Sequence, residues 1–255
     1  MNIHEYKAAP FNLPGVSQGY AEAAGVERLT AAEAEHRCGL KEGGLWFPYR
    51  SLAGEPIPLD GRPGCYGRLR LNVPRDDRKY HQRAGTKARG YVPHNFHLLT
   101  AQNDLVIVEG EKKCLALAEA GVAALGVGGI CSALSDGQFV PELNAAIQHM
   151  NLQRVLFLGD SDTSLIFSFS REAIKTARML PEHITVVLPR IGLDGPGKGI
   201  DDVRQALGAE FPAYWARIVA EAEPVSRDDT AEQLALRLFK RETQNALRLA
   251  AGQTT

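Results

Sequence analysis

The sequence predicts an α/β fold in which a parallel sheet flanked by helices follows a small β-rich region of α+β type. Between about residues 104 and 210, short apolar runs such as DLVIVEG and RVLFLGD alternate with helical patterns such as EKKCLALAEAG. Repeated β–α–β order produces parallel strands covered by helices. Upstream of this part, aromatic and β-branched pieces are broken by Gly and Pro, which is typical of antiparallel strands and turns.

Three segments follow from these patterns. We expect a basic, nucleic-acid-binding β-rich region at 1–100, a catalytic α/β domain at 101–223 and a C-terminal helix or linker at 224–255. In the first segment, Thr30 and Glu33 form a capping-box pattern that predicts a helix ending near Gly39. The last segment has apolar residues that fit a docking helix, a linker or the start of a further domain: Leu234, Leu236, Leu238, Leu247 and Leu249.

The composition is that of an ordinary globular protein. Hydrophobic residues make up 44% of the 255 residues and the formal net charge is −1, so nucleic-acid binding would depend on local clusters of positive charge. No apolar run has the length of about 18 residues that a membrane span needs, and the N-terminus lacks the pattern of a secretory signal. These features predict a cytoplasmic protein with no membrane partner.

The cysteines give no sign of a zinc site. Cys38, Cys65, Cys114 and Cys131 are too far apart in the sequence to form a CxxC half-site. We therefore expect reduced thiols and no zinc.

Acidic residues follow three of the predicted strand-containing segments. They are Glu109 and Glu111 after the first strand, Asp160 and Asp162 after the third, and Asp201 and Asp202, with Lys198, after the fourth. The carboxyl ends of parallel strands meet at one edge of a sheet, where these carboxylates would repel each other. Mg²⁺ (or Mn²⁺) prefers such oxygen ligands, although each residue could instead stabilise the start of a helix.

The segment from Arg62 to Arg89 is basic, and only Asp76 and Asp77 oppose its cations. Tyr66, Tyr80 and Tyr91 lie between the cations, and aromatic faces stack on the bases of single strands. The pattern favours a single-stranded nucleic-acid surface, although a solvated β face is the alternative. The candidate contacts are Arg68, Arg70, Arg78, Lys79, Tyr80, Arg83, Lys87 and Arg89.

A glycine turn follows the second strand of the α/β segment. Gly128 and Gly129 lie in the sequence GVGGI, which lacks the full GxGxxG dinucleotide pattern and does not follow the first strand. We expect this turn and Lys112 to face nucleotide phosphates instead.

The motifs VIVEGEKK, LFLGDSDT and GKGIDD together resemble the TOPRIM domain of DnaG-type primases, topoisomerases and some nucleases. The resemblance covers about residues 104–210 and implies metal binding by Glu109, Asp160 and Asp162. It matches Lys198, Asp201 and Asp202 to a later Lys-Asp segment. Lys113 departs from the family pattern, because many primases have Asp at that position. The preceding stretch KYHQRAGTKARGYVP is similar to what precedes TOPRIM domains in phage and plasmid primase-like proteins.

The resemblance implies a Mg²⁺-dependent primase-like nucleotidyltransferase that acts on nucleotides and a single-stranded DNA template. Such activity belongs to phage, plasmid or mobile-element replication, and Glu109, Asp160, Asp162 and Lys198 would be its catalytic residues. A metal-dependent nuclease could use the same carboxylates with water as nucleophile. A non-catalytic nucleic-acid-binding module that docks a helicase or another replication partner is the third hypothesis.

Overall fold

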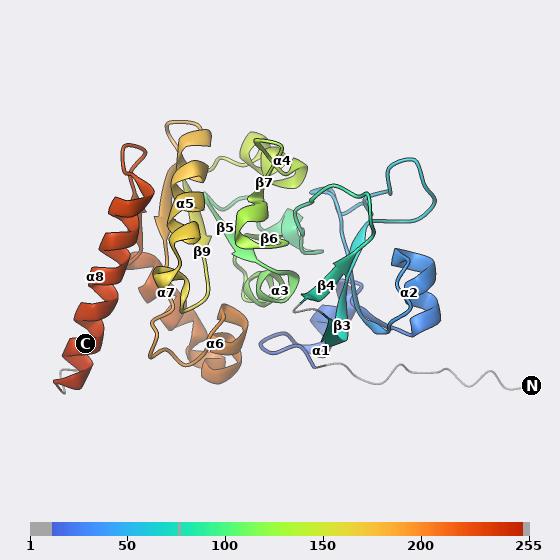
Figure 1. The fold of residues 1–255 in the computed structure, drawn as a ribbon, viewed down its shortest axis with the longest axis horizontal. Helices are drawn as coiled ribbons and strands as arrows, with labels where there is room; N and C mark the ends of the chain where they lie inside the picture. The colour runs from blue at the N-terminus through green and yellow to red at the C-terminus, as the bar shows by residue number, and fades with distance from the viewer. Residues whose placement is uncertain (1–11, 76–77, 252–255) are drawn as a thin grey trace, which may run out of the picture.

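Two β-sheets lie side by side along the molecule, one made by the N-terminal region and one by the rest of the chain (Figure 1). The structure is a computed structural model that describes residues 12–75 and 78–251. Some residues named above lie outside the residues and side chains it describes: Asp76, Asp77 and the side chains of Arg75, Cys131 and Leu249.

The N-terminal sheet is antiparallel, with strand order β1-β2-β3-β4. Leu69 and Leu71 of β3 are buried on one face of this sheet, and Arg68 and Arg70 alternate with them on the other. The two arginines therefore share one face of the strand. The elements of this region are α1 (Gln18–Ala23), β1 (Glu27–Leu29), α2 (Ala31–Cys38), β2 (Gly44–Pro48), β3 (Gly67–Arg75), β4 (Arg78–Gln82) and the 3₁₀ turn η1 (Phe96–Leu98).

The predicted capping box at the start of α2 is present. The Thr30 hydroxyl accepts the Glu33 backbone N–H at 3.3 Å, the Glu33 carboxylate accepts the Thr30 N–H at 2.7 Å, and Gly39 ends the helix in the left-handed conformation. Thr30→Ala is expected to lower the free energy of unfolding by about 1 kcal/mol, because it leaves an N-terminal N–H of the helix unbonded. Urea denaturation measures this, and Thr30→Ser should keep most of the stability. Equal losses in both variants would contradict the capping role.

The second sheet has the order β11-β10-β9-β5-β6, and its strands β5, β6, β9 and β10 run parallel to one another. Each coincides with an apolar run of the sequence, which confirms the predicted α/β class. Its strands are β5 (Asp104–Glu109), β6 (Ala124–Val127), β9 (Arg154–Leu158), β10 (Thr185–Leu188) and β11 (Glu223–Val225); a small hairpin, β7 (Leu134–Ser135) with β8 (Gln138–Phe139), lies outside it.

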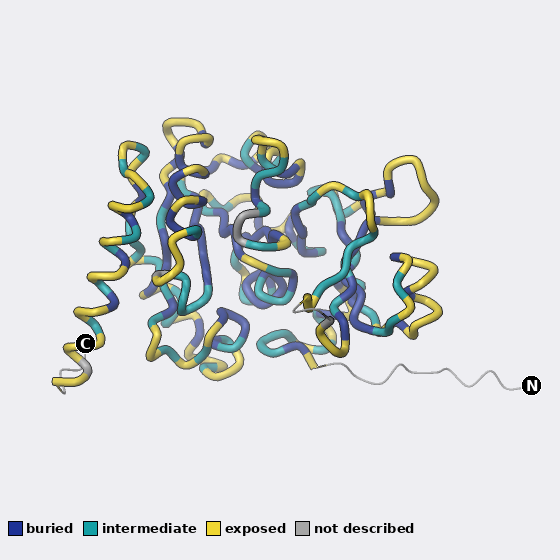
Figure 2. The backbone as a smooth tube through the Cα atoms, viewed as in Figure 1, coloured by how far each residue is buried: buried dark blue, intermediate teal, exposed yellow. Residues whose placement is uncertain are grey.

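Helices cover both faces of this sheet. Side chains of Ile107 and Phe157 point into a core with α4, α5 and α8, whereas Val108 and Leu158 point into a core with α3, α6 and α7. Figure 2 shows the strands buried between these layers. The helices are α3 (Glu111–Glu119), α4 (Pro141–His149), α5 (Phe167–Met179), α6 (Ile200–Leu207), α7 (Phe211–Ala220) and α8 (Ala231–Ala250), with short 3₁₀ turns η2 (Ile130–Ala133), η3 (Thr163–Leu165) and η4 (Gly208–Glu210).

The N-terminal sheet shares a core with the α/β part. Phe47 and Tyr49 belong to the same buried cluster as Val108 and Leu117 of β5 and α3. A polar contact adds to this, because Arg204 of α6 pairs with Glu119 of α3 at 2.7 Å while Glu119 also accepts the Ser17 N–H at 3.0 Å. The position of the antiparallel sheet against α3 is therefore fixed by packing rather than by a single linker.

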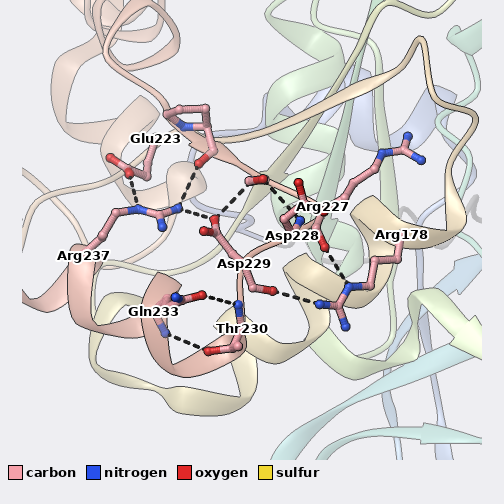
Figure 3. A network of polar contacts seen from close by, with 10 residues as sticks. Arg178, Glu223, Arg227, Asp228, Asp229, Thr230, Gln233 and Arg237 are labelled. Carbon is pink, nitrogen blue, oxygen red and sulfur yellow. Dashed lines mark hydrogen bonds and ion pairs between the residues drawn. The ribbon is translucent and has the colours of Figure 1, made fainter.

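The C-terminal segment is part of the packed structure. Strand β11 pairs antiparallel with β10 and spans the boundary expected at residue 223, and α8 buries Leu234 and Leu238 in the core. Leu236 and Leu247 of α8 are exposed. Figure 3 shows how the turn before α8 is held: Arg237 donates to Glu223 and Asp229 on one side, and Arg178 donates to backbone carbonyls of the turn on the other.

Within the described segments, no helix combines the length and the apolar character that crossing a bilayer requires.

Candidate active site

Three carboxylates lie at the carboxyl edge of the parallel sheet, as the order of the motifs predicts. Glu109 is the last residue of β5, Asp160 follows the end of β9 by two residues, and Asp162 immediately precedes η3. Because β5 and β9 are parallel neighbours in the sheet, the residues that follow them lie at the same edge.

The turn from β5 to α3 separates Glu109 from Glu111. Gly110 has a φ of +92°, a backbone conformation that other residues rarely adopt, and it begins α3. After this sharp turn Glu109 is exposed at the edge, whereas Glu111 is fully buried. Two carboxylates that are two residues apart in the sequence therefore lie in different environments.

Lys198 lies among the three edge carboxylates. Its ammonium group donates to Asp162 at 2.9 Å, and the Ser161 N–H donates to the Lys198 carbonyl at 2.9 Å, which ties the β10–α6 loop to the Asp-x-Asp segment. The pKa of Lys198 is raised, first by the hydrogen bond to Asp162 and its charge, then by Asp160 and Glu109. All four residues predicted to be catalytic thus interact electrostatically in one place.

A second layer of charge lies behind this group. Lys113 pairs with Asp160, and Lys112 pairs with Asp201 at 2.8 Å. The backbone of Gly199 lies close to both aspartates. A Cβ atom at this position would lie 2.6 Å from Asp201 Oδ1 and 3.4 Å from Asp160 Oδ1. Asp201 Oδ1 is buried and accepts no hydrogen bond from a described residue. The site therefore holds a buried oxygen that still lacks a partner.

The remaining two predicted metal ligands have other partners. Glu111 accepts a hydrogen bond from the Tyr49 hydroxyl at 2.7 Å and pairs with Arg68 at 2.9 Å, so its charge is compensated inside the core. Asp202 accepts the Gly199 N–H at 3.2 Å and caps α6. Their placement separates both residues from the edge group.

The edge group fits a divalent cation by its chemistry. Glu109, Asp160 and Asp162 offer the hard oxygen ligands that Mg²⁺ and Mn²⁺ take, and the Lys198 ammonium already stands in as a cation among them. Across residues 12–75 and 78–251, no three acidic, His or Cys side chains are positioned as a complete cation site. In this arrangement Lys198 pairs with Asp162 and Lys113 pairs with Asp160, so a cation bound there would compete with both lysines.

The arginine face of the N-terminal sheet contacts the start of α3 and the turn after β6 through Arg68. Tyr80 of β4 is paired in register with Arg70, and the Arg68 guanidinium lies over its ring at 4.8 Å. Burial raises the pKa of Tyr80, as does the charge of Glu111, whereas Arg70 lowers it. The pair between Arg68 of β3 and Glu111 of α3 at 2.9 Å places the β3–β4 face against the start of α3.

The other residues of the basic segment divide into those held by partners in the fold and those with exposed side chains. Arg89 pairs with the buried Glu142 at 3.2 Å, and Arg83 donates to the Arg37 carbonyl at 3.3 Å. Arg78, Lys79 and Lys87 are exposed, with Lys87 3.8 Å from exposed Asp136.

Two of the tyrosines predicted to interleave with the cations are not available for stacking. Tyr66 and Tyr91 are 4% and 1% exposed and pack in the core. Tyr80 is the aromatic residue of that set which remains beside the arginines.

The glycine turn after β6 lies under Arg68. The Arg68 guanidinium donates to the Gly128 carbonyl at 3.4 Å, and a Cβ atom at Gly128 would lie 3.1 Å from Arg68 Nη1. Gly129 follows at the start of η2, and Lys112 is engaged with Asp201. The turn is thus close to the carboxylate edge, next to a cation.

Two residues of the site were not anticipated from the sequence. Tyr49 lies 62 positions before its partner Glu111, and no local pattern signals that pairing. Lys113 carried a signal, because it replaces an acidic residue of the TOPRIM motif, and the structure places its ammonium group against Asp160.

Comparison with known sequences gives a partial match. The model of a family described as a domain of unknown function, DUF3854, matches residues 97–211. No curated protein matches this sequence.

Comparison with solved structures shows what the fold is similar to. The DnaG catalytic core aligns with a TM-score of 0.56 at 13% identity over 88% of this chain and 73% of that one. The catalytic core of the E. coli primase aligns with a TM-score of 0.55 at 14% identity over 82% and 71%. A DnaG primase catalytic domain bound to ssDNA aligns at 0.51 and 14% identity over 76% of this chain, which spans only 54% of that domain. The chain therefore has a primase-like fold that contains a TOPRIM-type sheet.

Proposed function

We propose that this chain is a metal-dependent, primase-like nucleotidyltransferase that extends an oligonucleotide on a single-stranded DNA template. The observation that carries the proposal is the convergence of Glu109, Asp160 and Asp162 around Lys198 at the carboxyl edge of the sheet. The primase-like fold supports it. In this assignment, residues 1–100 supply template binding, residues 101–223 supply catalysis, and residues 224–255 carry the C-terminal helix.

The reaction joins a hydroxyl oxygen to a nucleotide. A 3′-hydroxyl oxygen attacks the α-phosphorus of a nucleoside triphosphate, the bond from that phosphorus to the bridging oxygen breaks, and pyrophosphate leaves. Glu109 accepts the hydroxyl proton or orients the group that accepts it. Lys198 neutralises charge on the phosphates, while Asp160 and Asp162 hold metal. Mg²⁺ or Mn²⁺ supplies charge stabilisation for the attacking and leaving oxygens.

The β3–β4 face supplies the template surface in this proposal. Arg70 and Tyr80 are paired across β3 and β4 on the face from which Arg68 reaches Glu111, and exposed Arg78 and Lys79 extend the charge. Phosphates of a single strand would pair with the cations while a base stacks on the ring. The similarity of this segment to regions preceding TOPRIM domains favours replication of a phage, plasmid or other mobile element, with a helicase as partner.

The test compares the wild-type chain with Asp160→Asn/Asp162→Asn. Each is incubated with single-stranded DNA, labelled NTPs or dNTPs, and Mg²⁺ or Mn²⁺, and the products are resolved on a denaturing gel. New short oligonucleotides that the variant does not make are expected, because the variant loses two anionic ligands. Shortened DNA would show a nuclease that uses the same carboxylates. Binding without turnover under all conditions would favour a non-catalytic module.

A further inference from the structure

A large groove lies on the far side of the parallel sheet from the N-terminal region, between α7, α8 and the β10–α6 loop. Its volume is about 890 Å³, near the upper end of what small-molecule pockets have, so a single nucleotide would not fill it. Cationic side chains outnumber acidic ones along its walls. The cations are Arg190, Arg217, Arg237, Lys240, Arg241 and Arg248, and the acids are Asp194, Glu221, Glu223 and Glu242.

Two of the groove's acids are neutralised within the fold. Glu223 pairs with Arg237 at 3.0 Å and with Arg241 at 3.5 Å, and Glu242 pairs with Arg190. Figure 3 shows Arg237 bonded to Glu223 and also to Asp229. The internal ion pairs therefore use Arg190, Arg237 and Arg241, and the remaining cations of the groove outnumber its remaining acids, Asp194 and Glu221.

Three cations of the groove remain for a ligand. Among the ion pairs of the described residues, none includes Arg217, Lys240 or Arg248, and all three side chains belong to exposed residues. Arg217 lies over the Tyr214 ring at 5.3 Å. The groove thus combines free cations from two helices with an aromatic ring, the combination that nucleic-acid-binding channels use for backbone and bases.

Arg190 connects the groove to the carboxylate edge. It lines both the groove and a small cavity bounded by Gly159, Asp160 and Ser161. Its side chain is mostly buried, and its Nη1 atom donates to no acceptor among the described residues. Burial, and then the nearby Arg241 charge, lower the pKa of Arg190 to about 10. An anion bound beside it would offset both effects.

We propose that this groove binds the phosphate backbone of single-stranded nucleic acid that runs to or from the carboxylate edge. The proposal rests on the proposed function for the identity of the ligand. The β10–α6 loop links the two sites, since Gly195 and Pro196 line the groove and Lys198, two residues further along the loop, pairs with Asp162 in the edge group. The groove gives the single-stranded nucleic acid a second contact surface, on the opposite side of the carboxylate edge from the β3–β4 face.

The test uses Arg217→Ala/Lys240→Ala/Arg248→Ala in the full chain. Binding of a fluorescein-labelled oligo(dT) is followed by anisotropy in EDTA over a series of salt concentrations, so catalysis is not required. The dissociation constant is expected to rise at least tenfold. The slope of log affinity against log salt should fall in magnitude by about 2, because single strands lose about 0.7 per phosphate contact.

The matched control carries the same loss of charge elsewhere. Lys41→Ala/Arg171→Ala/Lys175→Ala changes exposed cations that do not line the groove. Equal effects in both triple variants, or no effect in either, would overturn the proposal. So would groove-dependent binding of poly-glutamate with no groove-dependent binding of oligo(dT), which would assign the groove to an acidic protein partner. If Asp160→Asn/Asp162→Asn shows no change in catalysis but the groove variant loses binding, the proposed function fails and the groove proposal stands.

Discussion

Glu109→Gln is expected to lower metal-dependent turnover by about 10²–10⁴-fold without changing the melting temperature. The factor is the usual contribution of a positioned general acid or base, and glutamine can neither take up a proton nor bind a cation as an anion. Glu109 is exposed at the end of β5, and the described contacts that involve it are electrostatic, through Lys198. Removing the charge of Glu109 is therefore expected to lower activity without disturbing the packing of the core.

The measurement separates chemistry from folding and from template binding. Initial rates of nucleotide incorporation at saturating Mg²⁺ give the loss of turnover, thermal unfolding gives the stability, and anisotropy in EDTA gives oligonucleotide affinity. Glu182→Gln is the control, because Glu182 is also exposed and lies outside the edge group. A variant that keeps full turnover would remove Glu109 from the proposed machinery. A variant that loses turnover only because it unfolds would show a structural role.

The sequence was sufficient to predict the sheet but not its last strand. The strands β5, β6, β9 and β10 are buried on both faces and therefore appear as continuous apolar runs. Strand β11 has three residues with Pro224 in the middle, which reads as a break. Because β11 is an edge strand, the backbone N–H that Pro224 lacks is not needed for a second neighbouring strand. The chain therefore adds a strand where the sequence pattern predicts a linker.

The candidate site was predictable where strand ends determine it. Glu109, Asp160 and Asp162 meet because parallel strands end at one edge, and that rule needs only the order of the segments. The partners of Glu111 are not local: Arg68 lies 43 residues earlier and Tyr49 lies 62 residues earlier. Only the packing of the N-terminal sheet on α3 brings them together. For the same reason, a basic pattern could not show that Arg68 and Arg89 are used in buried ion pairs.

The alternation of lysines and carboxylates has a physical consequence for the edge. Lys112, Lys113 and Lys198 each pair with one aspartate, so the acidic groups are held together before a metal arrives. Without these lysines the carboxylates would repel one another and resist ionisation. A divalent cation at this edge would compete with these ammonium groups, and Lys198 is the most exposed of the three.

Breaking the buried pair between Arg68 and Glu111 is expected to destabilise the fold by about 3–5 kcal/mol, the usual cost of leaving a buried charge without its partner. The side chains are 12% and 1% exposed, and the pair joins the N-terminal sheet to the start of α3. Burial disfavours the charged form of Arg68, but Glu111 and Tyr49 outweigh it and raise the pKa of Arg68. Arg68→Met leaves Glu111 with Tyr49 as its remaining described donor.

Urea denaturation of four chains tests this: wild type, Arg68→Met, Glu111→Gln, and Arg68→Met/Glu111→Gln. The double variant should recover part of the stability lost by each single variant, because it removes both charges rather than stranding one. Lys41→Met breaks the exposed pair between Lys41 and Glu35 and should cost no more than about 1 kcal/mol. If Arg68→Met costs as little as Lys41→Met, the Arg68–Glu111 pair does not hold the two sheets together. If the large loss is found, α3 and the adjoining Glu109 owe their position to the same arginine that the sequence marks as a nucleic-acid contact.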